Sequence, residues 1–488
     1  MESFKLYIDG QFDAGAATFT SLNPATAEPW ASIAEARGEQ TDRAVQAAAR
    51  AFESDAWRGL TAGARGKLLL KLADLIERDA PKLARLETLD TGKIIRETQA
   101  QIAYVAEYYR FYAGLADKMD GATLSIDKAD METWIKREPV GVVAAIIPWN
   151  SQLFLSAVKI GPAIAAGCTV VVKAAEVAPT PLLAFAELVH EAGFPAGVIN
   201  VITGFAEGCG TVLTQHPLVD HIAFTGGADT ARHIIRNSAE NLASTSLELG
   251  GKSPFIVFAD ADLDSAANAQ VAAIFSASGQ SCVAGSRLLV DEQIKDLFLE
   301  KLVSKVRGIV IGCPQQQETQ FGPLCTDKQK SNIEQVVNRS IEQGARLVIG
   351  NQPVDRPGFY YPPTILDCSA VPNAESVVQE LFGPVLSVLT FKDEADAIRL
   401  ANGTEYGLAA GVFTQNLTRA HRVTRKLRSG VVWLNTYRVV SPLAPFGGYG
   451  KSGFGREGGI DAALEYTTTK TVWLRTSDEP ISDPFIMR

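Results

Sequence analysis

The chain has 488 residues, which at roughly 100–200 residues per domain predicts several domains. Hydrophobic residues make up 46% of it and charged residues 21%, the balance of a globular protein with a sizeable core. The net charge of −9 and the lack of a basic tract argue against a nucleic-acid partner.

Cysteine and histidine spacing argues against a metal centre. The six cysteines include no CxxC pair and are too sparse for a disulfide framework, and the five histidines form no HExxH motif. Free cysteines suit a reducing compartment. The first residues lack the signal-peptide pattern, and prolines and polar residues interrupt the most apolar stretch, 140–172. We therefore expect a cytoplasmic protein with no membrane partner.

The first third of the chain is predicted to be helical. Helical periodicity extends over 42–52, 64–79 and 82–112, and the following stretch, 122–138, alternates like an extended arm. From residue 140 short β-branched runs alternate with amphipathic stretches. Strands are predicted at 142–147, 169–172, 198–202, 222–224 and 246–249, and helices at 151–166, 180–192, 207–215 and 229–241. This alternation indicates βαβ units and a parallel sheet.

The pattern restarts after Gly250-Gly251. Strands are predicted at 255–258, 287–290, 385–391, 410–413 and 431–434, with helices at 264–277, 294–307, 327–343, 394–402 and 417–427. The segment 466–474 is rich in β-formers. The predicted fold class is therefore α/β, with two doubly wound αβα domains and a small β arm.

Seven short segments resemble motifs of the aldehyde dehydrogenase superfamily. They are Pro148-Trp149-Asn150, Lys173-Ala-Ala-Glu176, Phe224-Thr-Gly-Gly227, Leu247-Glu-Leu-Gly-Gly-Lys-Ser-Pro254, Gly279-Gln-Ser-Cys282, Glu380-Leu-Phe-Gly-Pro384 and Trp433-Leu-Asn435. Each one alone is weak, but their shared order and spacing are specific. The resemblance covers nearly the whole chain and implies NAD-dependent oxidation of an aldehyde to its carboxylic acid.

The resemblance implies a catalytic set of Cys282, Glu248 and Asn150. A thiol that adds to the aldehyde forms a thiohemiacetal, loss of hydride gives a thioester, and water hydrolyses it. In this scheme Glu248 activates the water, and the Asn150 amide acts in the oxyanion hole with the Cys282 main-chain N–H. Taken alone, the three residues also fit a buried structural cysteine, a solvent-facing glutamate and a helix N-cap.

The cofactor contacts follow from the same resemblance. Glu176 would accept from the ribose 2′-OH and repel a 2′-phosphate, which favours NAD, although Ala174 and Ala175 replace the familiar Pro and Ser and leave NADP open. Ala206 and Gly227 also depart from the pattern, where the family usually has Gly and Ser. The expected cofactor-binding residues are Ile146, Pro148, Trp149, Lys173, Glu176, Gly204, Gly210, Phe224, Thr225, Gly226, Gly227, Leu249, Gly250, Glu380 and Phe382.

The resemblance implies two further groups of residues. Lys159 and Glu457 match a proton relay proposed in family members, and a snorkelling lysine and a rim glutamate are the alternatives. The substrate tunnel is expected to be lined by Ser151, Phe154, Leu155, Val158, Val283, Arg438, Val440 and Phe446. Small residues there suggest a medium-sized, partly polar or aromatic aldehyde. Arg438 would pair with a carboxylate of the substrate or with another subunit.

The family layout also implies domains and partners. Residues 1–118 and 139–249 would form the Rossmann-like NAD-binding domain and 250–450 the catalytic domain, while 451–466 return over the cofactor domain. Residues 119–138 and 467–488 would form an oligomerisation arm for a homodimer or homotetramer. Glu248 argues against a CoA-acylating enzyme. The catalytic set argues against a non-catalytic binding relative, and the cofactor residues argue against a simple thiol esterase.

Overall fold

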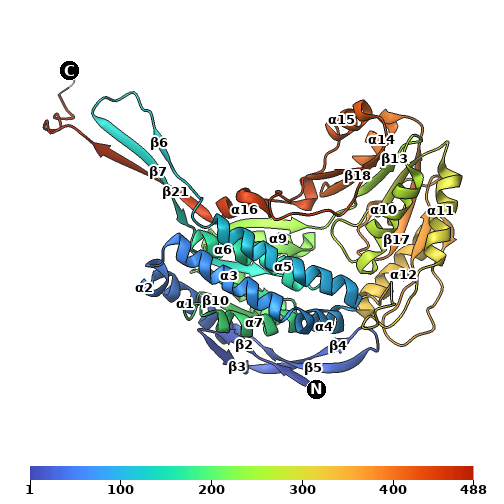
Figure 1. The fold of residues 1–488 in the computed structure, drawn as a ribbon, viewed down its shortest axis with the longest axis horizontal. Helices are drawn as coiled ribbons and strands as arrows, with labels where there is room; N and C mark the ends of the chain where they lie inside the picture. Colours follow the sequence, from blue (N-terminus) through green and yellow to red (C-terminus); the bar gives the residue numbers. More distant parts are fainter. Residues whose placement is uncertain (487–488) are drawn as a thin grey trace.

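The computed structural model describes residues 1–486, so residues 487 and 488 of the predicted arm segment lie outside the described residues. Two large sheets, each covered by helices, lie side by side, and a narrow β arm projects away from them (Figure 1). The predicted α/β class with two doubly wound units and a small β arm is confirmed. The domain boundaries proposed from the sequence remain predictions.

The first sheet has the strand order β20-β12-β11-β8-β9-β10-β2-β3. Its strands are β2 (Leu6–Ile8), β3 (Gln11–Asp13), β8 (Val142–Ile146), β9 (Thr169–Ala174), β10 (Ile199–Thr203), β11 (His221–Gly226), β12 (Ser244–Leu249) and β20 (Gly453–Phe454). The five central strands are parallel, and β20 and β2 pair antiparallel at either side. The chain fills one side of β8 and then the other, so the strand order reverses between β8 and β11. Ligands bind at the carboxyl ends of strands at such a reversal.

Helices cover both faces of this sheet. The helices α6 (Gln152–Ala166) and α7 (Thr180–Ala192) lie on one face, beneath an outer layer of α3 (Ala62–Arg78), α4 (Ala80–Thr91) and α5 (Ile95–Leu115). The other face carries α1 (Gly38–Glu53), α8 (Thr211–Gln215) and α9 (Ala228–Asn241), and α2 (Asp55–Arg58) follows α1. A methyl group at Gly161 would lie 2.7 Å from the Tyr112 ring, so this glycine allows α5 and α6 to approach closely.

The second sheet has the order β15-β16-β17-β14-β13-β18-β19 and is parallel except for β15. Its strands are β13 (Pro254–Val257), β14 (Arg287–Asp291), β15 (Arg346–Ile349), β16 (Thr364–Asp367), β17 (Val385–Phe391), β18 (Ala409–Phe413) and β19 (Val431–Leu434). Alternate residues of β13 enter different cores: Phe255 and Val257 pack on one face and Ile256 on the other. Both faces are therefore buried.

The helices of the second unit follow this division. The helices α10 (Leu263–Phe275) and α11 (Lys295–Arg307) contribute to the core around Phe255. The core around Ile256 receives α12 (Asp327–Glu342), α13 (Glu375–Val378), α14 (Glu394–Ala401) and α15 (Leu417–Thr424). The helix α16 (Gly459–Glu465) returns to pack on α6 of the first unit.

Two small sheets complete the fold. One has the order β1-β5-β4, from β1 (Glu2–Phe4), β4 (Ala17–Asn23) and β5 (Glu28–Glu35). The other is the arm, with the order β21-β7-β6, from β6 (Ala122–Leu124), β7 (Met131–Pro139) and β21 (Thr467–Arg475). The predictions of an extended 122–138 segment and a β-rich 466–474 segment are confirmed.

Several predicted helices differ from the observed ones. The single helix at 82–112 is wrong, because Gly92 adopts φ 78° and separates α4 from α5. The helix at 264–277 ends at Phe275, since Ala277 and Ser278 are left-handed, at φ 52° and 53°. The stretch 207–215 is a π-helical turn, Ala206–Gly210, followed by α8. The strands β1–β5 were not predicted; three of them have only 3 residues, too few to show a period.

Candidate functional site

Cys282 lies in the loop between a 3-10 turn, Ser276–Gly279, and β14. The left-handed residues Ala277 and Ser278 turn this loop sharply, and a methyl group at Gly279 would lie 2.2 Å from the carbonyl carbon of Gly383. Cys282 is partly exposed and lines a large cavity. Burial, with the carboxylates of Glu380 and Glu248 nearby, raises the pKa of the Cys282 thiol to about 12. The thiol is therefore protonated in the free protein.

Asn150 follows β8 and reaches the loop that carries Cys282. Its side-chain amide donates to the main-chain carbonyl of Gln280 over 3.1 Å. Ser151 Oγ donates to the Asn150 carbonyl over 2.7 Å, and Lys93 Nζ donates to that hydroxyl over 2.5 Å. Asn150 is not the N-cap of α6, because that position belongs to Ser151, whose side chain makes no capping bond. The Asn150 amide is thus oriented toward the cysteine loop.

Glu248 is the penultimate residue of β12 and is only 5% exposed. Neither carboxylate oxygen has a hydrogen-bond partner within residues 1–486. Burial, and then the neighbouring Glu457 carboxylate, raises the pKa of Glu248 well above its usual range. A methyl group at Gly447 would lie 2.6 Å from Oε1, so the carboxylate packs against the glycine that follows Phe446. Glu248 is not among the residues that line the cavity.

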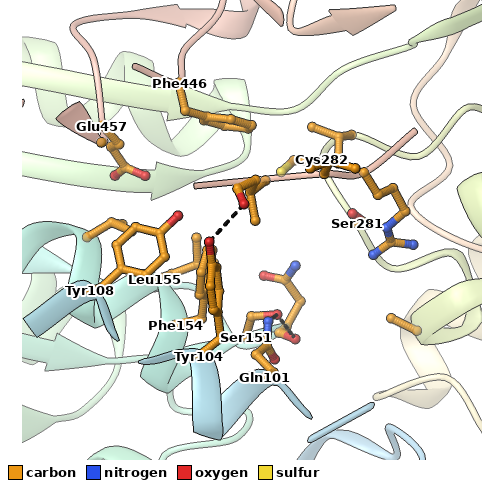
Figure 2. A pocket seen from close by; sticks show the side chains of 18 of the residues that line it. Gln101, Tyr104, Tyr108, Ser151, Phe154, Leu155, Ser281, Cys282, Phe446 and Glu457 are labelled. Atoms are coloured by element: carbon orange, nitrogen blue, oxygen red, sulfur yellow. Dashed lines mark hydrogen bonds between the residues drawn. The ribbon is translucent and has the colours of Figure 1, made fainter. Parts of the chain in front are cut away.

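Lys159 and Glu457 form a buried ion pair next to Glu248. Lys159, on α6, is 1% exposed, and its ammonium donates to the Glu457 carboxylate and to Thr225 Oγ1, the latter over 2.6 Å. Glu457 also lines the cavity, where it faces the same space as Tyr108 and Phe446 (Figure 2). The Thr225 hydroxyl, expected from the resemblance to lie at the cofactor, belongs to this cluster.

The carboxyl ends of β9 and β11 carry the residues expected to hold adenosine and pyrophosphate. Lys173 Nζ lies 3.2 Å from Glu176 Oε2, and the Glu176 side chain is 36% exposed. Gly227 is the N-cap of α9, and a methyl group added there would meet nothing within 4 Å. An open helix N-terminus with free N–H groups suits a phosphate. Gly226 has a different role: a methyl group there would lie 2.4 Å from the Phe224 ring, so the glycine leaves room for that ring.

Gly204 and Gly210, the other two glycines expected near the adenosine half of the cofactor, have different surroundings. A methyl group at Gly204 would lie 2.3 Å from the Ala36 carbonyl oxygen, so Gly204 is required by backbone packing. Gly210 ends the π-helical turn, and its Cβ position is 3.8 Å from Lys173 Cε. Gly210 therefore lies next to Lys173, which was expected to bind the ribose. Gly204, in contrast, is explained by backbone packing alone.

Glu380 and Phe382 lie where the two units meet. The Glu380 carboxylate accepts from the Gly251 N–H over 3.0 Å, and a methyl group at Gly250 would overlap it. Burial raises the pKa of Glu380 to about 7. Phe382, at φ 51°, packs edge-on against Trp149 with ring centroids 5.4 Å apart. Ile146 ends β8 and Pro148 directly precedes this tryptophan, and Leu249, which ends β12, precedes Gly250. This arrangement of an acid, two aromatic rings and side-chain-free backbone fits a ribosyl nicotinamide.

The cavity has a volume of about 530 Å³ and holds Cys282 in its wall. All eight residues predicted for the tunnel line it: Ser151, Phe154, Leu155, Val158, Val283, Arg438, Val440 and Phe446. Figure 2 shows Tyr104, Tyr108, Phe154 and Leu155 across the space from Cys282 and Phe446. A cavity of this size with an aromatic wall accepts a medium-sized ligand.

Sequence reasoning missed one wall of the cavity. The cavity is also lined by four residues of α5 and by one residue just before that helix. They are Glu97, Gln101, Tyr104 and Tyr108, and Lys93. Their spacing of three or four residues places them on one helical face, which is the signal that was present in the sequence. Tyr104 donates to the Val440 carbonyl over 2.9 Å and ties this helix to the opposite loop.

Residues 1–486 hold no group of three or more His, Cys, Asp or Glu side chains able to bind a metal ion. Within the same residues, none of the helices has the length and apolar character needed to span a bilayer.

The model of the aldehyde dehydrogenase family matches residues 12–472. The chain therefore belongs to the aldehyde dehydrogenase family, whose members oxidise aldehydes. It is 70% identical over 488 residues to (Z)-2-((N-methylformamido)methylene)-5-hydroxybutyrolactone dehydrogenase of Acinetobacter baylyi, with 100% of both chains covered.

Solved structures of aldehyde dehydrogenases share the fold of this chain over nearly its whole length. The NAD⁺ complex of aldehyde dehydrogenase from Bacillus cereus is 41% identical, with a TM-score of 0.96 over 98% of this chain and 97% of that one. Betaine aldehyde dehydrogenase from Staphylococcus aureus, in complex with NAD⁺, is 38% identical, with a TM-score of 0.97 over 99% of this chain and 97% of that one.

Proposed function

We propose that the protein oxidises an aldehyde to its carboxylic acid with NAD⁺, through a covalent intermediate on Cys282. The observation that carries this proposal is the Asn150–Gln280 hydrogen bond of 3.1 Å, because it holds an amide donor beside the only cavity-lining cysteine of residues 1–486. A thiol beside a fixed donor is what addition to a carbonyl requires.

The first step joins the Cys282 sulfur to the aldehyde carbon. The thiol gives up its proton to solvent water, the S–C bond forms, and the carbonyl π pair moves to oxygen as an oxyanion. Asn150 Nδ2 has a second N–H for that oxygen, and the Cys282 main-chain N–H has no partner within the described chain. The two donors together form the proposed oxyanion hole.

The cofactor would be held by two groups of residues. Lys173, Glu176, Gly210 and the open N-terminus of α9 at Gly227 suit its adenosine and pyrophosphate, and Glu380, Phe382 and Trp149 suit its nicotinamide half. When bound, NAD⁺ supplies the hydride acceptor that turns the thiohemiacetal into a thioester. The NAD⁺ complexes of the Bacillus cereus and Staphylococcus aureus relatives support this choice over NADP⁺.

Hydrolysis of the thioester is assigned to Glu248. Its unpartnered carboxylate takes a proton from water, the resulting hydroxide attacks the thioester carbon, and the C–S bond breaks to release the acid and the Cys282 thiolate. The raised pKa of Glu248 makes it a stronger base than an exposed glutamate. The Glu457–Lys159 pair is the proposed route for the released proton, because both charges act on Glu248 and Glu457 lines the cavity.

The substrate is proposed to be a medium-sized, partly polar aldehyde. The Acinetobacter relative is named for a 5-hydroxybutyrolactone. Such a ring is a cyclic hemiacetal ester, and its open form is an aldehyde that carries a carboxylate. A cavity of about 530 Å³ with aromatic residues on one wall accommodates a ligand of that kind.

The test is NADH formation from NAD⁺ and an aldehyde panel, with and without coenzyme A. We expect NADH without coenzyme A, and its loss in Cys282→Ser but not in Cys313→Ser, since Cys313 is partly exposed and lies outside the cavity lining. Turnover that requires coenzyme A would instead indicate an acylating enzyme. A protein that yields no NADH with any aldehyde would be a non-catalytic relative or an esterase.

We also propose a homodimer or homotetramer built on the arm. The strand β21 pairs with β7 on one side only, and its Trp473 and Leu474 are 56% and 46% exposed. Unpaired apolar edges of this kind need a partner. Light scattering after gel filtration tests this, and a monomeric mass would contradict it.

A further inference from the structure

Arg438 lies in the loop after β19, at a strained backbone position. Its φ of 63° is left-handed, which a side chain other than glycine adopts only when its surroundings hold it there. On either side of the loop, Trp433 Nε1 donates to the Val439 carbonyl over 2.8 Å and the Tyr437 hydroxyl donates to the Val283 carbonyl over 2.9 Å. The loop is therefore anchored before and after Arg438.

The guanidinium is fixed by one of its nitrogens. Nη1 donates to the carbonyls of Ala272 and Ser276, over 3.2 and 3.5 Å, at the C-terminal end of α10. A cation is stabilised at that end of a helix dipole. The Nε and Nη2 donors make no hydrogen bond within residues 1–486, so one planar edge of the fork is left unused.

The other charged groups of the cavity already have partners. Lys93 Nζ bonds to Glu87, to Gln101 and to Ser151. The Glu97 carboxylate accepts from the Ala277 N–H over 3.0 and 3.1 Å, and Glu457 pairs with Lys159. Arg438 forms no ion pair in the part of the chain that the structure describes, yet it lines the cavity with Cys282. Among residues 1–486 it is the one cation in the cavity lining whose N–H donors are not all used.

We propose that the Nε–Nη2 edge of Arg438 is a carboxylate subsite, which selects aldehydes that carry a carboxylate a few carbons from the reacting carbon. The inference rests on the proposed function. An arginine fork accepts the two oxygens of a carboxylate through parallel N–H bonds, and the fixed Nη1 leaves that edge preorganised. The open form of a 5-hydroxybutyrolactone belongs to this substrate class.

The experiment compares 4-oxobutanoate with butanal, which has the same carbon chain without the charge. In Arg438→Gln, kcat/KM for 4-oxobutanoate should fall about 30-fold more than kcat/KM for butanal, mainly through KM. Arg438→Lys, which keeps the charge but not the fork, should recover part of this ratio. Arg428→Gln is the matched control, because Arg428 is exposed and outside the cavity lining, and it should leave the ratio unchanged.

Equal losses for both aldehydes in Arg438→Gln would mean that Arg438 only caps α10, and unchanged kcat/KM values for both aldehydes would leave it to a subunit contact; either result overturns the subsite. Wild-type protein that oxidises butanal but shows no preference for 4-oxobutanoate would also overturn it, while the proposed function stands. Wild-type protein that forms NADH from neither compound nor any other aldehyde would overturn the proposed function itself.

Discussion

The side-chain amide of Asn150 donates to the carbonyl of Gln280, two residues before Cys282, and so joins the end of β8 to the cysteine loop. The two segments belong to different sheets, and the bond holds the amide beside the loop that carries Cys282. The proposed chemistry therefore depends on how the two units are held together as well as on the residues themselves.

Asn150→Ala should lower kcat by about 10²–10³, the usual cost of one oxyanion donor. Steady-state NADH formation measures this. Asn416→Ala is the control, because Asn416 caps α15 by accepting from the Arg419 N–H over 2.9 Å and lies outside the cavity. It should lose about 1 kcal/mol of unfolding free energy and no activity. Equal kcat losses in the two variants would contradict the role of Asn150.

Glu248→Gln should slow turnover by about 10²–10⁴ while a first equivalent of NADH still forms, because only hydrolysis needs the base. Rapid-mixing measurements separate the burst from the steady state. In the wild type, kcat should rise with pH as Glu248 loses its proton, above the usual range for glutamate because its pKa is raised. Glu207→Gln, an exposed change, should keep the wild-type profile. A Glu248→Gln enzyme with an unaltered profile would remove Glu248 as the base.

The same shift predicts a change in stability. Folding raises the pKa of Glu248, so the folded state holds the proton more tightly than the unfolded state. The stabilisation that protonated Glu248 contributes to the unfolding free energy is complete at pH values below its pKa in the unfolded chain. This stabilisation is lost as the pH rises through its pKa in the folded protein. Glu248→Gln should therefore raise Tm at neutral pH and not at acidic pH. Calorimetry at two pH values checks this, and equal shifts at both would contradict it.

Lys159→Met should cost about 3–5 kcal/mol of unfolding free energy, because it leaves the Glu457 carboxylate without its buried partner. Urea unfolding measures the loss, and the double variant Lys159→Met/Glu457→Leu should recover part of it. Lys82→Met breaks the exposed Lys82–Glu187 pair and should change stability by at most about 1 kcal/mol. A Lys159→Met loss no larger than that control would show that the pair contributes little.

Glu176→Gln should shift cofactor preference toward NADP⁺ by about tenfold in the ratio of kcat/KM values, because one negative charge no longer opposes the 2′-phosphate. Its side chain is 36% exposed beside Lys173, so the change should leave the fold intact. Glu207→Gln serves again as the control for the loss of one charge. An unchanged ratio would show that Glu176 does not select the cofactor.

Between residues 142 and 434 the sequence patterns predicted many of the helices and strands, for identifiable reasons. The helix at Thr180–Ala192 and the strand at Val431–Leu434 have the predicted limits, because a buried period and clear boundary residues coincide there. The tunnel residues were placed by resemblance, and all of them line the cavity. Their roles in catalysis and binding remain predictions.

What the sequence did not reveal depends on contacts between distant segments. The left-handed turn at Ala277 is held by Glu97, which is 180 residues away in the chain. The periodicity of α5 defines an apolar and aromatic face, but not that Tyr104 and Tyr108 look into a cavity beside Cys282. Gly92 is an exception: it is a left-handed glycine cap of α4, a local stop signal, but the helical periodicity resumes at Ile95 and so hides the boundary.

The helix α5 supplies a wall of the cavity but none of the groups proposed for bond making and breaking. Substitutions at Tyr104 or Tyr108 can therefore reshape the space while Cys282, Asn150 and Glu248 keep their positions. A natural lineage, or a designed library confined to this helix, can thus acquire a new substrate without rebuilding the reaction machinery.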